Sequence, residues 1–419
     1  RHALYPLDRG FENAYWLITG GANHFADPRS IFGDEDPVYY REGYEVQEFP
    51  ENFYSANTHT DKLIEYIDSN KDDGQPFFAM ASYTTPHWPL QVPDEYIEKY
   101  AGVYDEGYDS IREERIQRML DLGILEPGQT PAPRHPEYAA WDDLSEEMKQ
   151  REIRRMQVYA GMVDIMDENI GRLVDYLEEE DMYDDTVIIF FSDNGAEGND
   201  PGLLGSGSGN VRFDGYDNSL ENIGRRGSYT IQGPGWAHVS STPYFLHKGF
   251  ASEGGISSPL IIANSKLIPG GRTSDSFATV LDVLPTFLEL AETEHPGTEY
   301  QGREIFPPIG TSMLPLLKSE ADAVHPEDYV YAGELWNRKI VRQGDWKLSW
   351  MNAPWGDDGW QLFNLAEDIG EQNDLSASNP DKVAELMTHW EQYKEDNGVI
   401  ENPAFYIRYS NSNDYIQQD

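Results

Sequence analysis

The sequence predicts an α/β fold with a central, mostly parallel sheet flanked by helices, followed by a small C-terminal part. Two observations predict the large sheet, namely uninterrupted apolar runs at 77–82 and 187–191 and a long amphipathic helical pattern between them. Apolar runs of this kind suit strands that are covered on both faces, which is the usual state of parallel strands. Short strand-like runs after residue 328 predict a separate small antiparallel sheet. We therefore expect two units, 1–323 and 324–419.

The elements of the larger unit follow from local patterns. The first 60 residues contain glycine pairs and acidic turns and are expected to be loop-rich. A helix is expected at 60–69, just before the apolar run 77–82. Residues 101–145 carry proline and glycine breakers, which predict irregular surface structure. From residue 145 to 177, apolar side chains recur at three- and four-residue spacing, so this segment is predicted to be an amphipathic core helix.

The second half of the chain contains a loop and three further elements. The segment 198–235 is rich in Gly, Ser and Asn and predicts a long functional loop. A helix is expected at 277–290, where Pro285 predicts a kink or an N-terminal turn. A second helix, at 381–393, has an apolar face that would pack on the small sheet, and the polar end 406–419 is expected to fray. The strands of the small sheet are expected at 329–335, 339–342, 346–350 and 361–365.

Composition and charge exclude several classes of protein. The 419 residues are 39% hydrophobic and 13% aromatic, which is ample material for a buried core. No uninterrupted apolar stretch approaches the ~20 residues needed to cross a bilayer, so no membrane span is expected. The net charge is −44, from 75 acidic and 31 basic residues, which argues against nucleic-acid binding and suits a saline environment. The absence of cysteine excludes disulfides.

The most informative motif lies where the second apolar run stops. The run Val187 to Phe191 ends at Asp193, Asn194 and Gly195. A carboxylate and an amide carbonyl are hard oxygen ligands of the kind that Ca²⁺ or Mg²⁺ prefers, and glycine allows a sharp turn or a close approach. Functional groups of open α/β sheets gather at the carboxyl ends of strands. The alternative is a strand followed by an Asx turn without a metal.

Two further motifs place a histidine and a lysine near strand ends. His87 lies between Pro86 and Pro89, which restrict the backbone on both sides and fix where the imidazole points. A turn histidine stacked on Trp88 is the structural alternative. Lys248 precedes a glycine pair and another apolar strand, in a chain that is poor in lysine. Elsewhere on the chain a lysine would be read as a solvated surface residue.

These three segments, in this order, resemble the sulfatase family of the alkaline-phosphatase superfamily, and in detail the bacterial arylsulfatases. The resemblance covers nearly the whole chain and implies an alkaline-phosphatase-like fold. The further matching strings are Arg9-Gly10-Phe11-Glu12, the segments 218–225 and 233–237, and Leu362-Phe363-Asn364-Leu365 with Asp368, Glu371 and Asn373-Asp374-Leu375.

The resemblance implies a sulfuric ester hydrolase that cleaves a small sulfate monoester to sulfate and an alcohol or phenol. Asp193 and Asn194 would hold a divalent cation, with Ca²⁺ preferred and Mg²⁺ as the alternative. Lys248 would bind a sulfate oxygen, and His87 would contact the sulfate or the bridging oxygen and help to protonate the leaving group. Arg225 is a further candidate for anion binding, and it is an equally good candidate for anchoring its loop to acidic residues.

The chain departs from the family at the nucleophile. Sulfatases use a Cys/Ser-x-Pro-Ser/Thr-Arg motif whose first residue is oxidised to formylglycine. This chain has no cysteine and no such serine motif, because 241–244 and 130–134 lack the required pattern. The paired aspartates of the family's first strand and its Gly-Lys-x-His segment are also absent. We therefore expect the chain to be amino-terminally incomplete by roughly a hundred residues, and to have no turnover by itself.

Two alternatives remain open from the sequence. One is a phosphate mono- or diesterase or a phosphonate hydrolase of the same superfamily, and the other is a non-catalytic metal-binding relative. The string Pro-His-Trp-Pro-Leu-Gln and the string Asn-Ile-Gly-Arg favour the sulfatase. His238 and His247 are expected to be buried histidines with backbone partners. The resemblance alone implies location in the periplasm or secretion, and the natural ester and the oligomeric state are left open.

Overall fold

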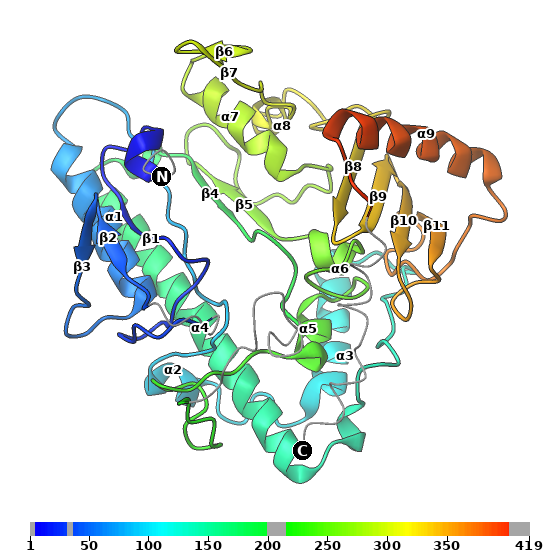
Figure 1. Cartoon of the computed structure of the whole chain (residues 1–419), viewed down its shortest axis with the longest axis horizontal. Helices are drawn as coiled ribbons and strands as arrows, with labels where there is room; N and C mark the ends of the chain where they lie inside the picture. The colour runs from blue at the N-terminus through cyan, green and yellow to red at the C-terminus, as the bar shows by residue number, and fades with distance from the viewer. Residues whose placement is uncertain (1–4, 32–36, 199–214, 402–419) are drawn as a thin grey trace.

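A computed structural model describes residues 5–31, 37–198 and 215–401 and has α/β architecture, as predicted (Figure 1). The longest described helix, α4 (Glu146–Glu179), runs diagonally from the bottom of the view to its left side and packs on α1 (Ser55–Asn70). The side chain of Ser145 accepts a hydrogen bond from the backbone N–H of Met148, which caps the start of α4. The predicted helices at 60–69 and 145–177 are thereby confirmed.

The central strands differ in detail from the predicted parallel arrangement. Strand β4 (Ile188–Phe191) pairs with β5 (Leu260–Ala263), and the pair is antiparallel, with Ile189 opposite Ile262. The apolar run 77–82 forms no strand in the described part of the chain. An apolar run does not determine whether a strand pairs in the parallel or the antiparallel direction. The run 77–82 would also need a neighbouring strand to pair with its backbone N–H and C=O groups.

A cleft of about 2450 Å³ separates the run 77–82 from β4. Helix α4 contributes Met156, Tyr159 and further side chains to its lining. The large apolar side chains that line the cleft and are more than two-fifths exposed include Phe77, Phe78, Met80, Val280 and Leu284. Within the described residues, this cleft is therefore an open apolar surface next to the carboxyl end of β4.

The segment 101–145, predicted to be irregular, contains a regular helix. Helix α3 (Gly107–Asp121) has no proline or glycine after its first residue, and it packs on α5 (Pro234–Ser240). Its buried Tyr108 meets Trp236 edge to face, with ring centroids 5.5 Å apart. The prediction of irregular structure was wrong here because the breakers lie after the helix and its apolar face is short.

Smaller elements occupy the first hundred residues. Three short strands make an antiparallel sheet in the part predicted to be loop-rich. They are β1 (Tyr15–Leu17), β2 (Tyr40–Glu42) and β3 (Glu45–Gln47). Tyr40 is buried at the centre of the aromatic cluster that this sheet covers. Helix α2 (Asp94–Lys99) then packs on α4.

The C-terminal part matches its prediction closely. Four antiparallel strands form a sheet in the order β11-β10-β9-β8, and α9 (Pro380–Asn397) lies along one face of it (Figure 1). The strands are β8 (Val330–Leu335), β9 (Arg338–Gln343), β10 (Trp346–Met351) and β11 (Gly359–Asn364). Leu386 and Trp390 of α9 are buried against Val341 and Leu348. The boundary at 323/324 stays a prediction.

The remaining elements are short helices, a two-stranded hairpin and 3₁₀ turns. Helix α7 (Val283–Leu290) is shorter than predicted, and Pro285 lies in its first turn, as one of the two predicted options required. The others are α6 (Glu253–Ile256), α8 (Leu314–Leu317), β6 (Glu299–Tyr300), β7 (Arg303–Glu304) and the 3₁₀ turns at Pro6–Arg9, Trp141–Asp143, Tyr183–Asp185 and Val280–Asp282. Among the described helices, none has both the length and the apolar character that a bilayer span requires.

Candidate active site

Strand β4 delivers Asp193 and Asn194 to a tight turn at the edge of the cleft. The turn is fixed by Gly195, whose N–H donates to the carbonyl of Gly255 over 3.0 Å. A Cβ at Gly195 would lie 1.9 Å from the carbonyl oxygen of Gly254, so this close approach requires glycine. The amide of Asn194 donates to the carbonyl of Gly195 over 3.0 Å, which orients its side chain.

His87 lies on a turn between two cis peptide bonds, Thr85–Pro86 and Trp88–Pro89. Its Nδ1 is 2.8 Å from the carbonyl oxygen of Trp88, and its ring contacts the indole at a centroid distance of 4.5 Å. A carbonyl only accepts hydrogen bonds, so Nδ1 carries the hydrogen and Nε2 presents a lone pair to the cleft when the ring is neutral. The two rings are tilted by 44°, so the histidine contacts Trp88 without the predicted stacking, and its Nε2 faces other polar groups.

Lys248 meets His87 across the cleft. The Nζ atom of Lys248 is 3.4 Å from His87 Nε2 and 3.0 Å from a carboxylate oxygen of Glu197. The backbone N–H of Lys248 donates to the carbonyl of Ala196 over 2.9 Å, which ties the lysine segment to the turn after β4. His87, Lys248, Asp193 and Asn194 all line the same cleft. The structure thus brings together the three segments that the sequence singled out.

The charges around His87 favour its neutral form. Burial lowers the pKa of His87, and the positive charge of Lys248 lowers it further. The carboxylates of Glu197 and Asp193 act in the opposite direction, and so does the hydrogen bond to Trp88. The neutral imidazole can accept a hydrogen bond at Nε2, and an anion bound nearby would favour its protonation.

A second histidine supports the turn that carries His87. His24 is buried, and its Nε2 donates to the carbonyl of His87 over 2.9 Å while its Nδ1 accepts from Ser55 Oγ over 2.8 Å. The backbone N–H of His24 donates to Gln91 Oε1, and Gln91 Nε2 donates to the carbonyl of Ser228 over 2.6 Å. The turn is therefore held from both the N-terminal segment and the loop before α5.

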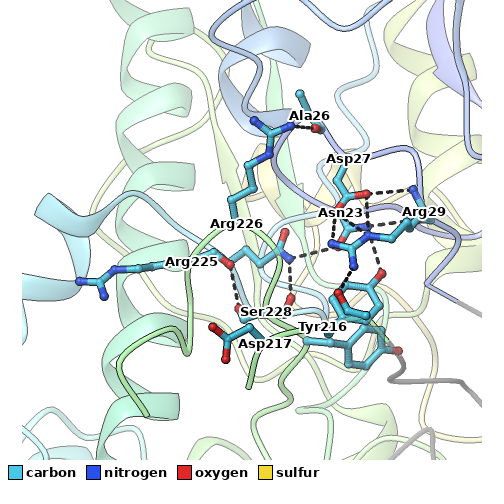
Figure 2. A network of polar contacts seen from close by, with 12 residues as sticks. Asn23, Ala26, Asp27, Arg29, Tyr216, Asp217, Arg225, Arg226 and Ser228 are labelled. Carbon is cyan, nitrogen blue, oxygen red and sulfur yellow. Dashed lines mark hydrogen bonds and ion pairs between the residues drawn. The ribbon is translucent and has the colours of Figure 1, made fainter. Parts of the chain in front are cut away.

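Arg225, the other predicted anion ligand, has acidic and backbone partners. Its Nε donates to Asp94 over 2.7 Å, and its guanidinium also bonds the carbonyl of Glu221. Figure 2 shows Arg225 pointing away from the network in which Arg226 reaches the carbonyl of Ala26. These contacts agree with the predicted role of Arg225 as a loop anchor. Its other predicted role, binding of the substrate anion, stays a prediction.

The same network fixes the loop against the N-terminal segment. The guanidinium of Arg29 pairs with Asp27, and it stacks on the ring of Tyr216 at 4.1 Å from the centroid (Figure 2). Asn23 reaches the hydroxyl of Tyr216 over 3.3 Å. Residues 199–214 of the predicted functional loop lie outside the described residues.

His247 and His238 are buried, as expected. His247 Nε2 accepts from the hydroxyl of Tyr138 over 2.8 Å, and its Nδ1 donates to the carbonyl of Lys248 over 3.1 Å. Burial lowers the pKa of His247 to about 4 and that of His238 to about 3. The backbone partner predicted for His247 is present, whereas the ring Nε2 of His238 has no hydrogen-bond partner in the described structure.

Glu197 and His24 are the site residues that sequence reasoning missed. Glu197 follows Asp193 by four positions, and that spacing on the same loop was the available signal. His24 gave no comparable signal, because its partners Ser55 and His87 lie far from it in the sequence.

The side-chain oxygens of Asp193 and Asn194 are donor atoms of the type that a hard cation binds. The two residues supply fewer than the six to eight oxygens that Ca²⁺ takes. The described residues contain no group of three or more His, Cys, Asp or Glu side chains placed to hold a metal ion. Asp193 and Asn194 therefore account for part of a ligand set.

Comparison with known proteins identifies the family. The sulfatase family model matches residues 8–293. An uncharacterized sulfatase of Schizosaccharomyces pombe is 38% identical over 417 residues, covering 96% of this chain and 74% of that protein. An arylsulfatase of Klebsiella aerogenes is 34% identical over 311 residues, covering 74% of this chain and 66% of the arylsulfatase.

Solved structures agree on the fold. The crystal structure of Ps i-CgsB is similar with a TM-score of 0.62 and 22% identity, covering 95% of this chain and 69% of that one. At this identity the likeness concerns the fold. The family match, the two relatives and the arrangement of Asp193, His87 and Lys248 around one cleft lead to one conclusion: the chain belongs to the sulfatase family of the alkaline-phosphatase superfamily.

Proposed function

We propose that the protein hydrolyses sulfate monoesters, giving sulfate and an alcohol or a phenol. The observation that carries the proposal is the 3.4 Å approach of Lys248 Nζ to His87 Nε2 in a cleft that Asp193 and Asn194 also line. A sulfate group presents several anionic oxygens, which need a fixed cation, a hydrogen-bonding partner and hard-cation ligands around them. These four side chains supply that set of groups.

Lys248 would bind a non-bridging sulfate oxygen. Its ammonium has three donors, and it pairs with Glu197 and faces His87 Nε2. A sulfate oxygen would take over one of these positions and receive a charge-assisted hydrogen bond. The fixed positive charge would then stabilise the charge that develops on the sulfate oxygens as the ester bond breaks.

His87 would transfer a proton at Nε2. Nδ1 stays bonded to the carbonyl of Trp88, so the ring keeps its orientation when Nε2 gains a proton. An incoming sulfate adds negative charge beside the ring and favours that protonation. The imidazolium could then donate from Nε2 to the bridging oxygen and help the alcohol to leave.

Asp193 and Asn194 would contribute two oxygen ligands to a divalent cation, for which Ca²⁺ is the first candidate and Mg²⁺ the second. When bound, such an ion would offset the negative charge of the sulfate group. Gly195 holds both ligands at the edge of the cleft through its contact with Gly255. The nucleophile, expected to be formylglycine, is absent from the printed sequence and stays a prediction.

The substrate is proposed to be a small or singly sulfated ester. The net charge of −44 repels large polyanions, whereas a small ester can reach a local site that contains Lys248. A relative from Bacteroides thetaiotaomicron, 24% identical over 446 residues, is an N-acetylglucosamine-6-O-sulfatase, so a sulfated sugar is one candidate beside an aryl sulfate. Export to the periplasm or the medium is part of the same proposal.

Hydrolysis of matched chromogenic esters tests this function. Protein expressed from the complete reading frame would be assayed with 4-nitrophenyl sulfate, 4-nitrophenyl phosphate and a phenyl phosphonate. We expect the sulfate to have the highest kcat/KM, and Lys248→Ala to lower that value by about 10²–10³-fold. The control is Lys99→Ala, since Lys99 is exposed and pairs only on the surface with Asp164.

Two outcomes would contradict the proposal. A higher kcat/KM for the phosphate or phosphonate would favour the phosphoesterase alternative. Absence of turnover, together with sulfate binding that depends on Lys248, would favour a non-catalytic relative.

A further inference from the structure

The segment 247–256 carries Lys248 and has little regular structure of its own. Gly249 has φ of +92°, and the short helix α6 begins only at Glu253. On one side the segment is tied to the turn after β4 through Lys248 and Gly255. The other side faces the C-terminal sheet, and Arg338 and Lys347 of that sheet make polar contacts with it.

Arg338, the first residue of β9, makes the first contact. Its side chain is buried, and its Nη1 donates to the carbonyl of Gly249, the residue next to Lys248. The same guanidinium stacks on the ring of Phe250 at 4.1 Å from the centroid. The planar group therefore fixes both a backbone carbonyl and a side chain directly after Lys248.

A buried ion cluster makes the second contact. Lys347 of β10 has a side chain only 1% exposed, and its Nζ lies 2.8 Å from Glu253 and 2.9 Å from Glu371. Glu371 also accepts from the backbone N–H of Glu253 over 2.7 Å. Both carboxylates and the ammonium are thereby paired at the start of α6, where an unpaired charge would be costly.

We infer that the C-terminal sheet positions Lys248 for anion binding, with Arg338 as the principal positioning residue and the Lys347–Glu253–Glu371 cluster as its second anchor. The inference rests on the proposed function, in which Lys248 binds a sulfate oxygen. Neither Arg338 nor Lys347 lines the cleft, so both act through the backbone of the segment 247–256.

The geometry explains why two anchors are needed. Lys248 Nζ must stay within reach of His87 Nε2, which belongs to a turn on the far side of the cleft. A glycine directly after the lysine leaves that backbone free to rotate unless its carbonyl is held. Removal of the Arg338 bond would let the ammonium sample other positions, and ordering it again on binding would cost affinity.

Lys339, the next residue of β9, provides a matched control. It is also a buried cation, but alternation along the strand turns it to the opposite face. There its ammonium pairs with Glu401 and lies 5.7 Å from the ring centroid of Trp390. Arg338→Met and Lys339→Met each replace a buried cation of the same strand by an apolar chain, and only the first loses contact with Gly249.

The test combines sulfate binding with hydrogen exchange. Inorganic sulfate would be titrated into each protein at constant ionic strength, and amide exchange would be followed across 246–256. We expect Arg338→Met to raise the Kd for sulfate by up to about tenfold, the cost of ordering one long side chain again on binding, and to speed exchange in that segment. Lys339→Met should change neither, even if urea unfolding shows an equal loss of stability.

The outcomes separate this inference from the proposed function. Arg338→Met with unchanged sulfate affinity and unchanged exchange would overturn the inference. If wild-type protein and Lys248→Ala bind sulfate equally, the role of Lys248 fails, and exchange in 246–256 still decides whether Arg338 holds the segment. Should Arg338→Met fail to fold, Arg338→Lys keeps the charge but loses the planar contact, and it is expected to show the same two changes.

Discussion

His24 Nε2 lies 2.9 Å from the carbonyl oxygen of His87, so one buried histidine holds the backbone of another. Replacing His24 by Leu removes this donor and also leaves Ser55 Oγ without its acceptor. We expect a loss of about 1–3 kcal/mol in the free energy of unfolding, because buried polar groups are left unpaired. Urea unfolding measures it. His24→Gln keeps an N–H near Nε2 and should lose less, and equal losses would contradict this assignment.

Acid should begin to destabilise the protein at a pH above the range in which most carboxylates titrate. Burial lowers the pKa of His24, His59 and His247 to about 4, below the ordinary value of 6.5. The unfolded chain therefore binds protons first, and stability falls as the pH drops from 6.5 towards 4. Urea midpoints measured across this window check it. His59→Phe should flatten the dependence, and a slope that stays the same would argue against burial as the cause.

Lys248 and Glu197 should move the pKa of His87 in opposite directions. The charge of Lys248 lowers this pKa and that of Glu197 raises it. Lys248→Ala is therefore expected to raise the pKa of His87, and Glu197→Gln to lower it. Titration of the His87 ring protons by NMR measures both shifts. Shifts of the same sign in the two variants would show that these side chains do not act on His87 through their charges.

Gly195 should tolerate no side chain. Gly195→Ala would place a Cβ 1.9 Å from the carbonyl of Gly254 and displace the turn that carries Asn194. We expect a loss of about 1–3 kcal/mol in stability, typical of overpacking, together with weaker Ca²⁺ binding. The control is Gly171→Ala on α4, where nothing lies within 4 Å and stability should rise by up to about 1 kcal/mol. Urea unfolding measures the stability of the two variants, and calorimetric titration with Ca²⁺ measures their binding of the ion.

The two carboxylates around Lys347 should differ in their contribution to stability. Burial raises the pKa of Glu371, whereas Lys347 and Arg342 outweigh burial at Glu253 and lower its pKa. Glu253 is then the principal charged partner. Glu253→Gln should cost about 3–5 kcal/mol, the effect of breaking a buried pair, and Glu371→Gln clearly less. Urea unfolding at pH 7 compares them, and the reverse order would place the charge on Glu371.

Much of the fold was predictable because it depends on local patterns. Helix α4 has a sustained apolar spacing and a serine cap, and the small sheet and α9 have short apolar runs separated by turns. Helix α3 was missed because it has a short apolar face beside a segment with many breakers. The antiparallel pairing of β4 with β5 could not be predicted, since an apolar run does not encode the direction of its neighbour.

The candidate site was predictable residue by residue but not contact by contact. Asp193 and His87 each follow an apolar run, whereas Lys248 precedes a glycine pair and another apolar run, and these positions marked them. The partner of Arg225 is Asp94, which lies 131 residues away and has no motif around it. Contacts of this kind depend on tertiary packing, and so does the hydrogen bond from Arg338 to the carbonyl of Gly249.

The open apolar cleft has a consequence for the behaviour of this polypeptide in solution. Side chains such as Phe78 and Met80 are exposed on a molecule whose net charge is −44. At low ionic strength, repulsion between like-charged molecules keeps these surfaces apart. Added salt shortens the range of that repulsion but leaves the apolar attraction, so self-association grows with ionic strength. The negative charge, which suits a saline environment, therefore protects the isolated chain from self-association least when the salt concentration is high.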